Sequence, residues 1–173
     1  FLTPGWIFLV GKDKTIVSYI CCVTLILWEP SGIKIISSKT FSFELPNFSA
    51  VNVGNPHAIF FFNKDKPEIE KMGHFIEHHE MFAEKVNVSF AETINDDHIF
   101  IDVWERGTGI TKACGSAACA TTAAAASLNI ISRNTKISFA GGDLNISWKD
   151  DNNIVMTGPY EIEEKLEIDI SDF

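Results

Sequence analysis

The segment GSAACATTAAAASL, residues 115–128, most constrains what this chain can fold into. It contains only small residues apart from its final leucine, and it has no polar face. Alanine is the strongest helix former, and a helix without a polar side has to be buried on every side. Small side chains also let strands approach the helix axis closely. The sequence therefore predicts a sheet curled around a central alanine-rich helix.

The rest of the chain alternates between strand-like runs and turns, so we expect an α+β fold, a β-barrel or curled mixed sheet around that helix. A second helix is expected over residues 67–82, with Pro67 in its first turn. Apolar and β-branched runs predict strands in the following segments: residues 6–10, 15–28, 33–45, 49–62 with a break at 54–57, 86–94, 98–104, 135–149 as a hairpin, 154–157 and 160–170.

Charge and cysteine usage exclude several classes of protein. The formal net charge is −9 and no basic cluster occurs, which argues against nucleic acid or an anionic membrane surface as a partner. The apolar run at residues 16–28 is too short to span a bilayer and lacks signal-peptide flanks, so we expect a cytoplasmic protein. Cys21, Cys22, Cys114 and Cys119 show neither metal-ligand spacing nor a disulfide framework, which predicts reduced thiols and no metal.

The amino end of the alanine-rich helix carries the residues best suited to chemistry. Cys114, Gly115 and Ser116 lie where unpaired N–H groups and the helix dipole favour an anion such as a carboxylate. The same field is expected to lower the pKa of the Cys114 thiol, and Glu105 is close enough in sequence to exchange a proton with it. Proton abstraction next to a carboxylate, acyl transfer by the thiolate, and a merely structural cysteine all remain open.

Three motifs narrow these alternatives by resemblance. VNVGNPHAIF, VNVSF and VWERGTGITKACGSAACA occur in this order, and the similarity continues through GGDLNISW and MTGP, over about residues 46–160. Together they resemble the carboxy-terminal half of diaminopimelate epimerase, a pyridoxal-independent enzyme of lysine and peptidoglycan-precursor synthesis. The resemblance implies one half of a two-lobed fold, in which each lobe is a barrel around one helix. Residues 1–45 would then be a strand-rich lead-in and residues 46–173 the carboxy-terminal lobe.

The resemblance also implies roles for individual residues. Cys114 would be one of two acid/base thiols that interconvert LL- and meso-2,6-diaminopimelate without a cofactor, and Glu105 would tune or relay its proton. His57 would lie against the other catalytic cysteine. The implied substrate-binding residues are Asn55, Asn87 and Arg106 at the far amino-acid end, and the amides of Gly115 and Ser116 at the α-carboxylate.

Two departures from the family pattern leave alternatives open. The first half of the family carries a Cys-Gly-Asn-Gly motif that this chain lacks, and Ala117 replaces a usual glycine. Inverting a stereocentre with two bases needs one on each face, so the implied partner is a missing amino-terminal half or a homodimer partner. The alternatives are an inactive remnant or interaction module, and a related proline-type racemase, against which the Glu105–Arg106 pair argues.

Ordinary structural roles compete with several of these residues. Asn55 and Asn87 are also typical of turns and strand ends, and Arg106 could simply pair with Glu105. The string GHFIEHHE places His74, Glu77, His78 and His79 at helical spacing. We expect no metal there, because no cysteine or further ligand accompanies them.

Overall fold

The computed structural model describes residues 6–10, 15–20, 24–26, 48–62 and 66–160. Its strands form one eleven-stranded sheet with the order β1-β2-β11-β10-β9-β7-β6-β5-β4-β3, and β8 pairs with β7. The β5–β6 and β7–β9 pairs are parallel, and the other pairs are antiparallel. The elements are β1 (Trp6–Val10), β2 (Thr15–Ile20), β3 (Thr24–Ile26), β4 (Phe48–Asn52), β5 (Pro56–Phe62), α1 (Ile69–Glu77), β6 (Asn87–Asn95), β7 (His98–Glu105), β8 (Gly109–Thr111), α2 (Gly115–Ser127), β9 (Asn134–Phe139), β10 (Gly142–Trp148) and β11 (Ile154–Pro159).

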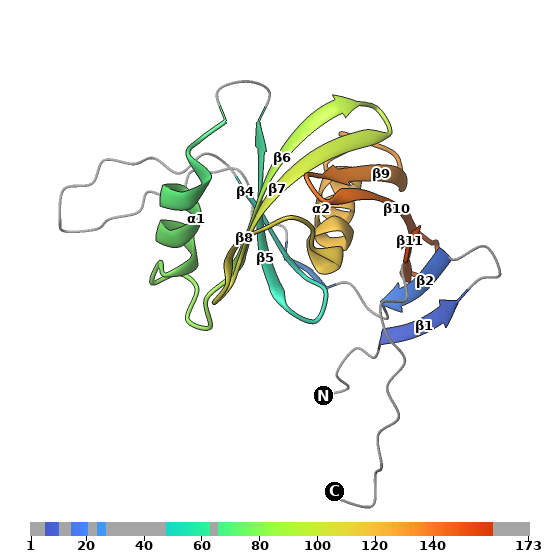
Figure 1. The fold of residues 1–173 in the computed structure, drawn as a ribbon, viewed down its shortest axis with the longest axis horizontal. Coiled ribbons are helices and arrows are strands. Elements are labelled where there is room, and N and C mark those ends of the chain that lie inside the picture. The colour runs from blue at the N-terminus through green and yellow to red at the C-terminus, as the bar shows by residue number, and fades with distance from the viewer. Residues whose placement is uncertain (1–5, 11–14, 21–23, 27–47, 63–65, 161–173) are drawn as a thin grey trace, which may run out of the picture.

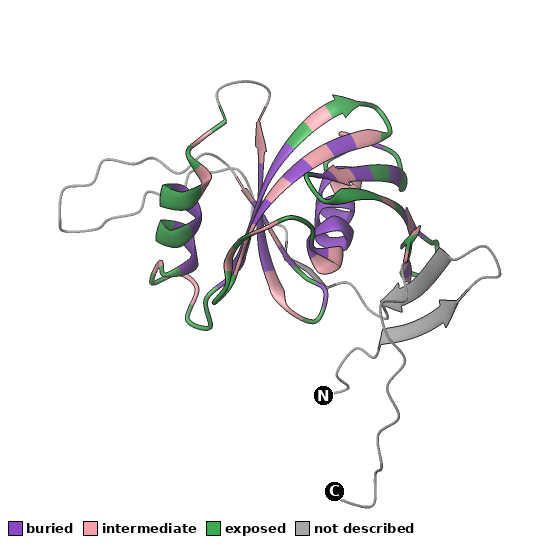
Figure 2. Cartoon of the chain, in the orientation of Figure 1, coloured by how far each residue is buried: buried purple, intermediate pink, exposed green. Residues whose placement is uncertain are grey.

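Helix α2 lies inside the curl of the sheet, as its composition predicts (Figure 1). All nine residues from Ala117 to Ala125 are buried, so no side of the helix faces solvent over this stretch (Figure 2). Large apolar side chains of the strands fill the space around it, including Ile59, Ile99 and Ile137. The predicted α+β fold, a mixed sheet curled around the alanine-rich helix, is therefore confirmed.

The two parallel pairs put the two helices on opposite faces of the sheet. Helix α1 connects β5 to β6 and packs outside the curl, whereas α2 lies in the connection from β7 to β9 and fills the inside (Figure 1). Strand β7 alternates accordingly: Ile99, Ile101 and Val103 belong to the inner core around α2, while Trp104 packs against the outer core beneath α1. One strand thus contributes side chains to both cores.

Helix α1 is shorter than the predicted span of 67–82. It begins after the extended residue Glu68 and ends at Glu77, and Pro67 precedes it rather than lying in its first turn. Phe82 reaches the outer core through turns instead of a further helical turn, and its ring lies 6.0 Å from that of Phe48. The apolar spacing beyond Glu77 therefore reflects a packed loop.

Several predictions fall on residues outside those that the structure describes. They concern Cys21 and Cys22, the strand at 33–45, and the final strand beyond Tyr160. The division between residues 1–45 and 46–173 also stays a prediction, since the boundary lies within 27–47. No helix among the described residues is long and apolar enough to cross a membrane.

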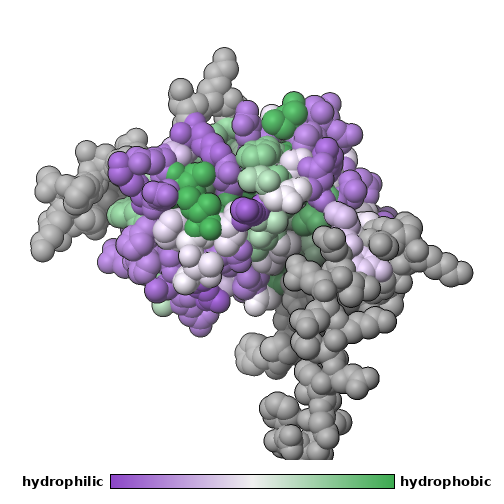
Figure 3. Space-filling model, viewed as in Figure 1, coloured by the Kyte–Doolittle hydropathy of each residue, from purple (hydrophilic) through white to green (hydrophobic). Residues whose placement is uncertain are grey.

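The visible described surface is mostly hydrophilic, and hydrophobic residues form separate small areas on it (Figure 3). The exposed large hydrophobic side chains of the described residues are Phe75, Ile94, Ile110 and Leu128. They belong to four separate segments of the chain: α1, β6, β8 and the residue after α2. Single exposed apolar residues are ordinary on protein surfaces, so they do not define a binding face.

Candidate active site

The site is built at the amino end of α2, where the chain enters the helix from β8. Cys114 is the extended residue before the helix, with φ −147° and ψ 112°, and it is 9% exposed. The Gly141 amide donates to the carbonyl oxygen of Lys112 at 2.8 Å, which ties the entering segment to the β9–β10 hairpin. The thiol is thus held between a buried helix and the sheet.

Four of the predicted site residues form one hydrogen-bonded chain. Asn55 donates through Nδ2 to Ser116 Oγ at 3.2 Å, and its Oδ1 lies 3.2 Å from His57 Nε2. Because an amide oxygen only accepts, His57 has to donate through Nε2. Ser116 Oγ lies 3.4 Å from Cys114 Sγ, and a hydroxyl that accepts from Asn55 can still donate its own proton to the sulfur. Donors can therefore follow one direction along these four residues, from His57 to Cys114.

His57 is a buried neutral base in this arrangement. Burial, together with the nearby charge of Arg106, lowers its pKa to about 3. Its proton is on Nε2, so Nδ1 carries a lone pair, and no hydrogen-bond partner of Nδ1 occurs within the described ranges. An imidazole of this kind can accept a hydrogen bond at Nδ1 from a group brought against it and remain neutral.

The expected lowering of the Cys114 pKa is wrong. Burial raises the pKa of this thiol, while the Ser116 hydroxyl and the Ala117 amide at the third helical position lower it. The Glu105 carboxylate raises the pKa again, both as a negative charge and as a hydrogen-bond partner of the thiol. The helix end does favour the thiolate, as predicted, but desolvation outweighs it.

Glu105 is the last residue of β7, and Arg106 follows it in the turn to β8. The Arg106 amide donates to Asn87 Oδ1 at 2.9 Å, and Asn87 Nδ2 donates to the carbonyl oxygen of Pro56 at 3.0 Å. Asn87 is also the register partner of His57 on the neighbouring parallel strand. The Arg106 guanidinium donates through Nη1 to the carbonyl oxygen of Glu84 at 2.7 Å. No Arg106–Glu105 ion pair occurs among the described residues.

The structure therefore brings the predicted site residues together. Cys114, Gly115 and Ser116 begin the helix, Asn55 and His57 join them through hydrogen bonds, and Glu105 acts on the thiol. Asn87 and Arg106 are connected to the same group through Pro56, which lies between Asn55 and His57.

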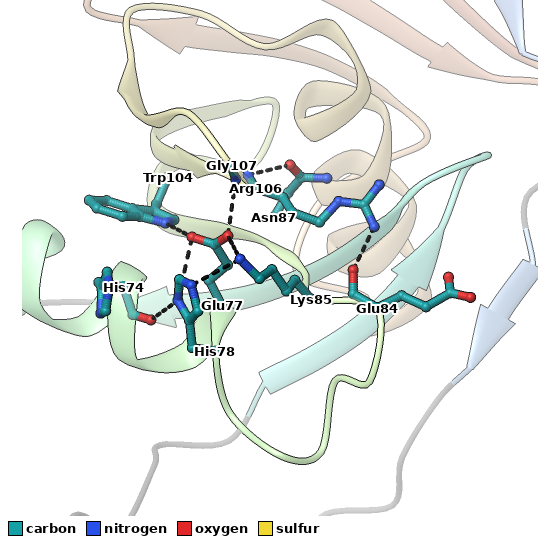
Figure 4. Close-up of polar contacts among 9 residues, drawn as sticks. All are labelled: His74, Glu77, His78, Glu84, Lys85, Asn87, Trp104, Arg106 and Gly107. Carbon is teal, nitrogen blue, oxygen red and sulfur yellow. Dashed lines mark hydrogen bonds and ion pairs between the residues drawn. The ribbon is translucent and has the colours of Figure 1, made fainter.

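The string GHFIEHHE does not predict the burial of Glu77. Glu77 at the end of α1 is 2% exposed, and its carboxylate accepts from Trp104 Nε1 at 2.8 Å and from the Gly107 amide at 3.0 Å (Figure 4). An acidic residue between histidines suggests a solvated helix face. The available signal was Gly73, four residues earlier, which lies on the same face of the helix and marks a close packing contact.

Comparison with known proteins identifies the family of the chain. The family model of diaminopimelate epimerase matches residues 49–163. A protein named diaminopimelate epimerase from Methylorubrum extorquens is 45% identical over 117 residues, which cover 66% of this chain and 40% of that protein. One of the same name from Bacillus cereus is 46% identical over 118 residues, covering 66% of this chain and 41% of that protein.

A solved structure supports the same fold over more of the chain. A probable proline racemase from Agrobacterium radiobacter K84, crystallised with bound carbonate, is similar with a TM-score of 0.59 and 10% identity. The similarity covers 90% of this chain and 56% of that one, and it shows the fold alone. This chain spans about 40% of the length of the curated relatives that it matches. Because the family model covers the whole site and the helix that carries it, the chain belongs to the diaminopimelate epimerase family.

Proposed function

We propose that this chain supplies one of the two acid/base lobes of a diaminopimelate epimerase, which interconverts LL- and meso-2,6-diaminopimelate without a cofactor. The observation that carries the proposal is the hydrogen-bonded chain from His57 through Asn55 and Ser116 to Cys114. These bonds connect the Cys114 thiol and Ser116 at the start of α2 with His57, the residue expected to lie against the other catalytic cysteine. Similarity to relatives of that name supports the same substrate class.

In this proposal Cys114 exchanges the proton at the α-carbon of the substrate. The free N–H groups of Gly115 and Ser116 at the start of α2 hold the α-carboxylate and stabilise the negative charge that develops on its oxygens. Before Cys114 can act as the base, Glu105 accepts the proton of its thiol, and the Ser116 hydroxyl stabilises the resulting thiolate. The thiolate then takes the proton from the α-carbon. Asn55, Asn87 and Arg106 bind the far amino-acid end.

The opposite face of the α-carbon needs a second thiol, which a partner would supply. The Cys-Gly-Asn-Gly string that carries it in the family does not occur in this sequence. His57 suits a position beside that thiol, because it is neutral and keeps a lone pair on Nδ1. That thiol would come from an amino-terminal half of the family fold, or from a second copy of this chain. Because the reaction requires free thiols, a reducing compartment, the cytoplasm, fits the proposal.

Solvent-deuterium exchange into diaminopimelate tests the function directly. The chain would be assayed alone and mixed with the amino-terminal half of a family member, and exchange would be followed by mass spectrometry. We expect exchange in the mixture, and its loss in Cys114→Ala. A mixture without exchange, despite a demonstrated complex, would instead support an inactive family member. Exchange that survives Cys114→Ala would refute the assigned role of the thiol.

A further inference from the structure

Glu77 is a buried carboxylate that the proposed chemistry does not use. Trp104 Nε1 donates to its Oε2, and the Gly107 amide donates to its Oε1. Lys85 Nζ lies 3.5 Å from Oε1 and supplies the nearest positive charge (Figure 4). The two residues that donate hydrogen bonds to Glu77, Trp104 and Gly107, therefore directly flank Glu105 and Arg106 in the sequence.

The turn after β7 depends on side chains from outside it. Three successive amides are satisfied in three ways: Arg106 donates to Asn87 Oδ1, Gly107 to Glu77 Oε1, and Thr108 to the carbonyl oxygen of Glu105. Only the last of these bonds is internal to the turn. Gly107 has φ +78°, a conformation that is unfavourable for other residues. Asn87 from β6 and Glu77 from α1 thus fix the backbone of this segment.

Only a carboxylate satisfies both donors. Trp104 and Gly107 approach different oxygens, so a glutamine would meet one of them with its amide nitrogen, which also donates. Two side chains face the carboxylate as possible cations: Lys85 Nζ lies 3.5 Å from Oε1, and His78 Nδ1 lies 3.8 Å from Oε2. His78 Nδ1 also contacts the His74 carbonyl oxygen, and its Nε2 lies 3.0 Å from Lys85 Nζ. Lys85 is therefore the closer of the two.

We propose that Glu77 is a positioning residue: it fixes the β7–β8 turn, which begins at Glu105 and includes Arg106, and so sets how closely the Glu105 carboxylate approaches the Cys114 thiol. Glu77 itself lies on the outer face of the sheet with α1 and acts only through the turn. The significance of this contact for proton transfer rests on the proposed function, whereas the mechanical link between Glu77 and the thiol does not.

The test measures alkylation of Cys114 by iodoacetamide as a function of pH in the full chain, with the modified peptide followed by mass spectrometry. Because Glu105 raises the pKa of this thiol, Glu105→Gln is expected to move the midpoint to lower pH. Glu77→Gln should produce at least half of that shift. The double variant should then shift no further than Glu105→Gln alone, since both act on one contact. Glu80→Gln, the same change at an exposed position three residues away, should leave the midpoint unchanged.

Two results would overturn the proposal: a folded Glu77→Gln protein with the wild-type midpoint, or a double variant whose shift is the sum of the single ones. If Glu77→Gln does not fold, the alkylation midpoint of Cys114 in the Glu77→Asp variant provides the test. It keeps the charge but is one methylene too short to reach both donors, so the midpoint should still fall, and an unchanged midpoint would again refute the role.

The exchange assay with the amino-terminal half distinguishes the two proposals. There Glu77→Gln should slow deuterium incorporation by about tenfold or more, since small displacements of an acid/base group are costly. Wild-type protein that fails to exchange would refute the proposed function. The alkylation profile needs no substrate, so it would still decide the role of Glu77.

Discussion

Replacing Gly73 with alanine tests the close packing of α1 on β7. A Cβ atom at this position would lie 2.5 Å from Trp104 Cγ and 2.6 Å from Trp104 Cβ. The second of these atoms is attached to the backbone of β7, so no rotation of the indole relieves the overlap. Helix or strand would have to move, and the Trp104–Glu77 hydrogen bond would move with them.

Two effects of opposite sign set the magnitude. Alanine favours a helix interior over glycine by about 1 kcal/mol. Overpacking of a well-filled contact costs about 1–3 kcal/mol, and the contact with an immobile Cβ places this case at the upper end of that range. We therefore expect Gly73→Ala to lower the free energy of unfolding by about 1–2 kcal/mol, which corresponds to a decrease in Tm of about 2–8 °C.

Urea and thermal unfolding followed by circular dichroism measure this change. Glu70→Ala, at an exposed position of the same helix, is the matched control and should alter stability by no more than about 0.5 kcal/mol. A Gly73→Ala protein that is as stable as the wild type, or more stable, would show that helix propensity outweighs the contact. The account of α1 as tightly packed on Trp104 would then be wrong.

Two further predictions concern the ends of the hydrogen-bonded chain. Ser116→Ala removes a hydroxyl that lowers the pKa of Cys114, so alkylation of this thiol at pH 8 should slow about two- to tenfold; a faster reaction would contradict the assigned donor direction. His57 has a pKa of about 3 in the folded chain and 6.5 unfolded, so between these values only the unfolded state binds its proton, and stability should fall as the pH falls. The loss approaches about 1.4 kcal/mol per pH unit below 6.5, and urea titrations of His57→Gln should lack this component.

The sequence allowed the centre of the fold to be predicted because its signal is unambiguous. An alanine-rich helix without a polar face admits only burial, and Ile99, Ile101 and Val103 alternate as a strand requires. The end of α1 was not predictable from spacing, because Phe82 keeps its place in the core through turns. Apolar periodicity reports burial and does not distinguish a helical turn from a packed loop.

The candidate site was also predictable only in part. The motifs marked Cys114, Ser116, Asn55 and His57, and the structure connects them. The sign of the Cys114 pKa change was missed because it is a balance between the helix end and desolvation, and burial cannot be quantified from sequence. The buried role of Glu77 was not predictable for a related reason: its donors, Trp104 and Gly107, are distant in sequence and meet it only through packing.

The strand order has a consequence for how the chain folds. Strands β4 to β10 can pair with neighbours close in sequence, whereas β2 pairs with β11, joining residues 15–20 to residues 154–159. The entropy cost of closing such a long loop has to be met before that pairing contributes any stability. During synthesis, β1 and β2 leave the ribosome long before β11 exists. Although they precede the other described strands in the sequence, they can join the sheet only after β11 has formed its edge.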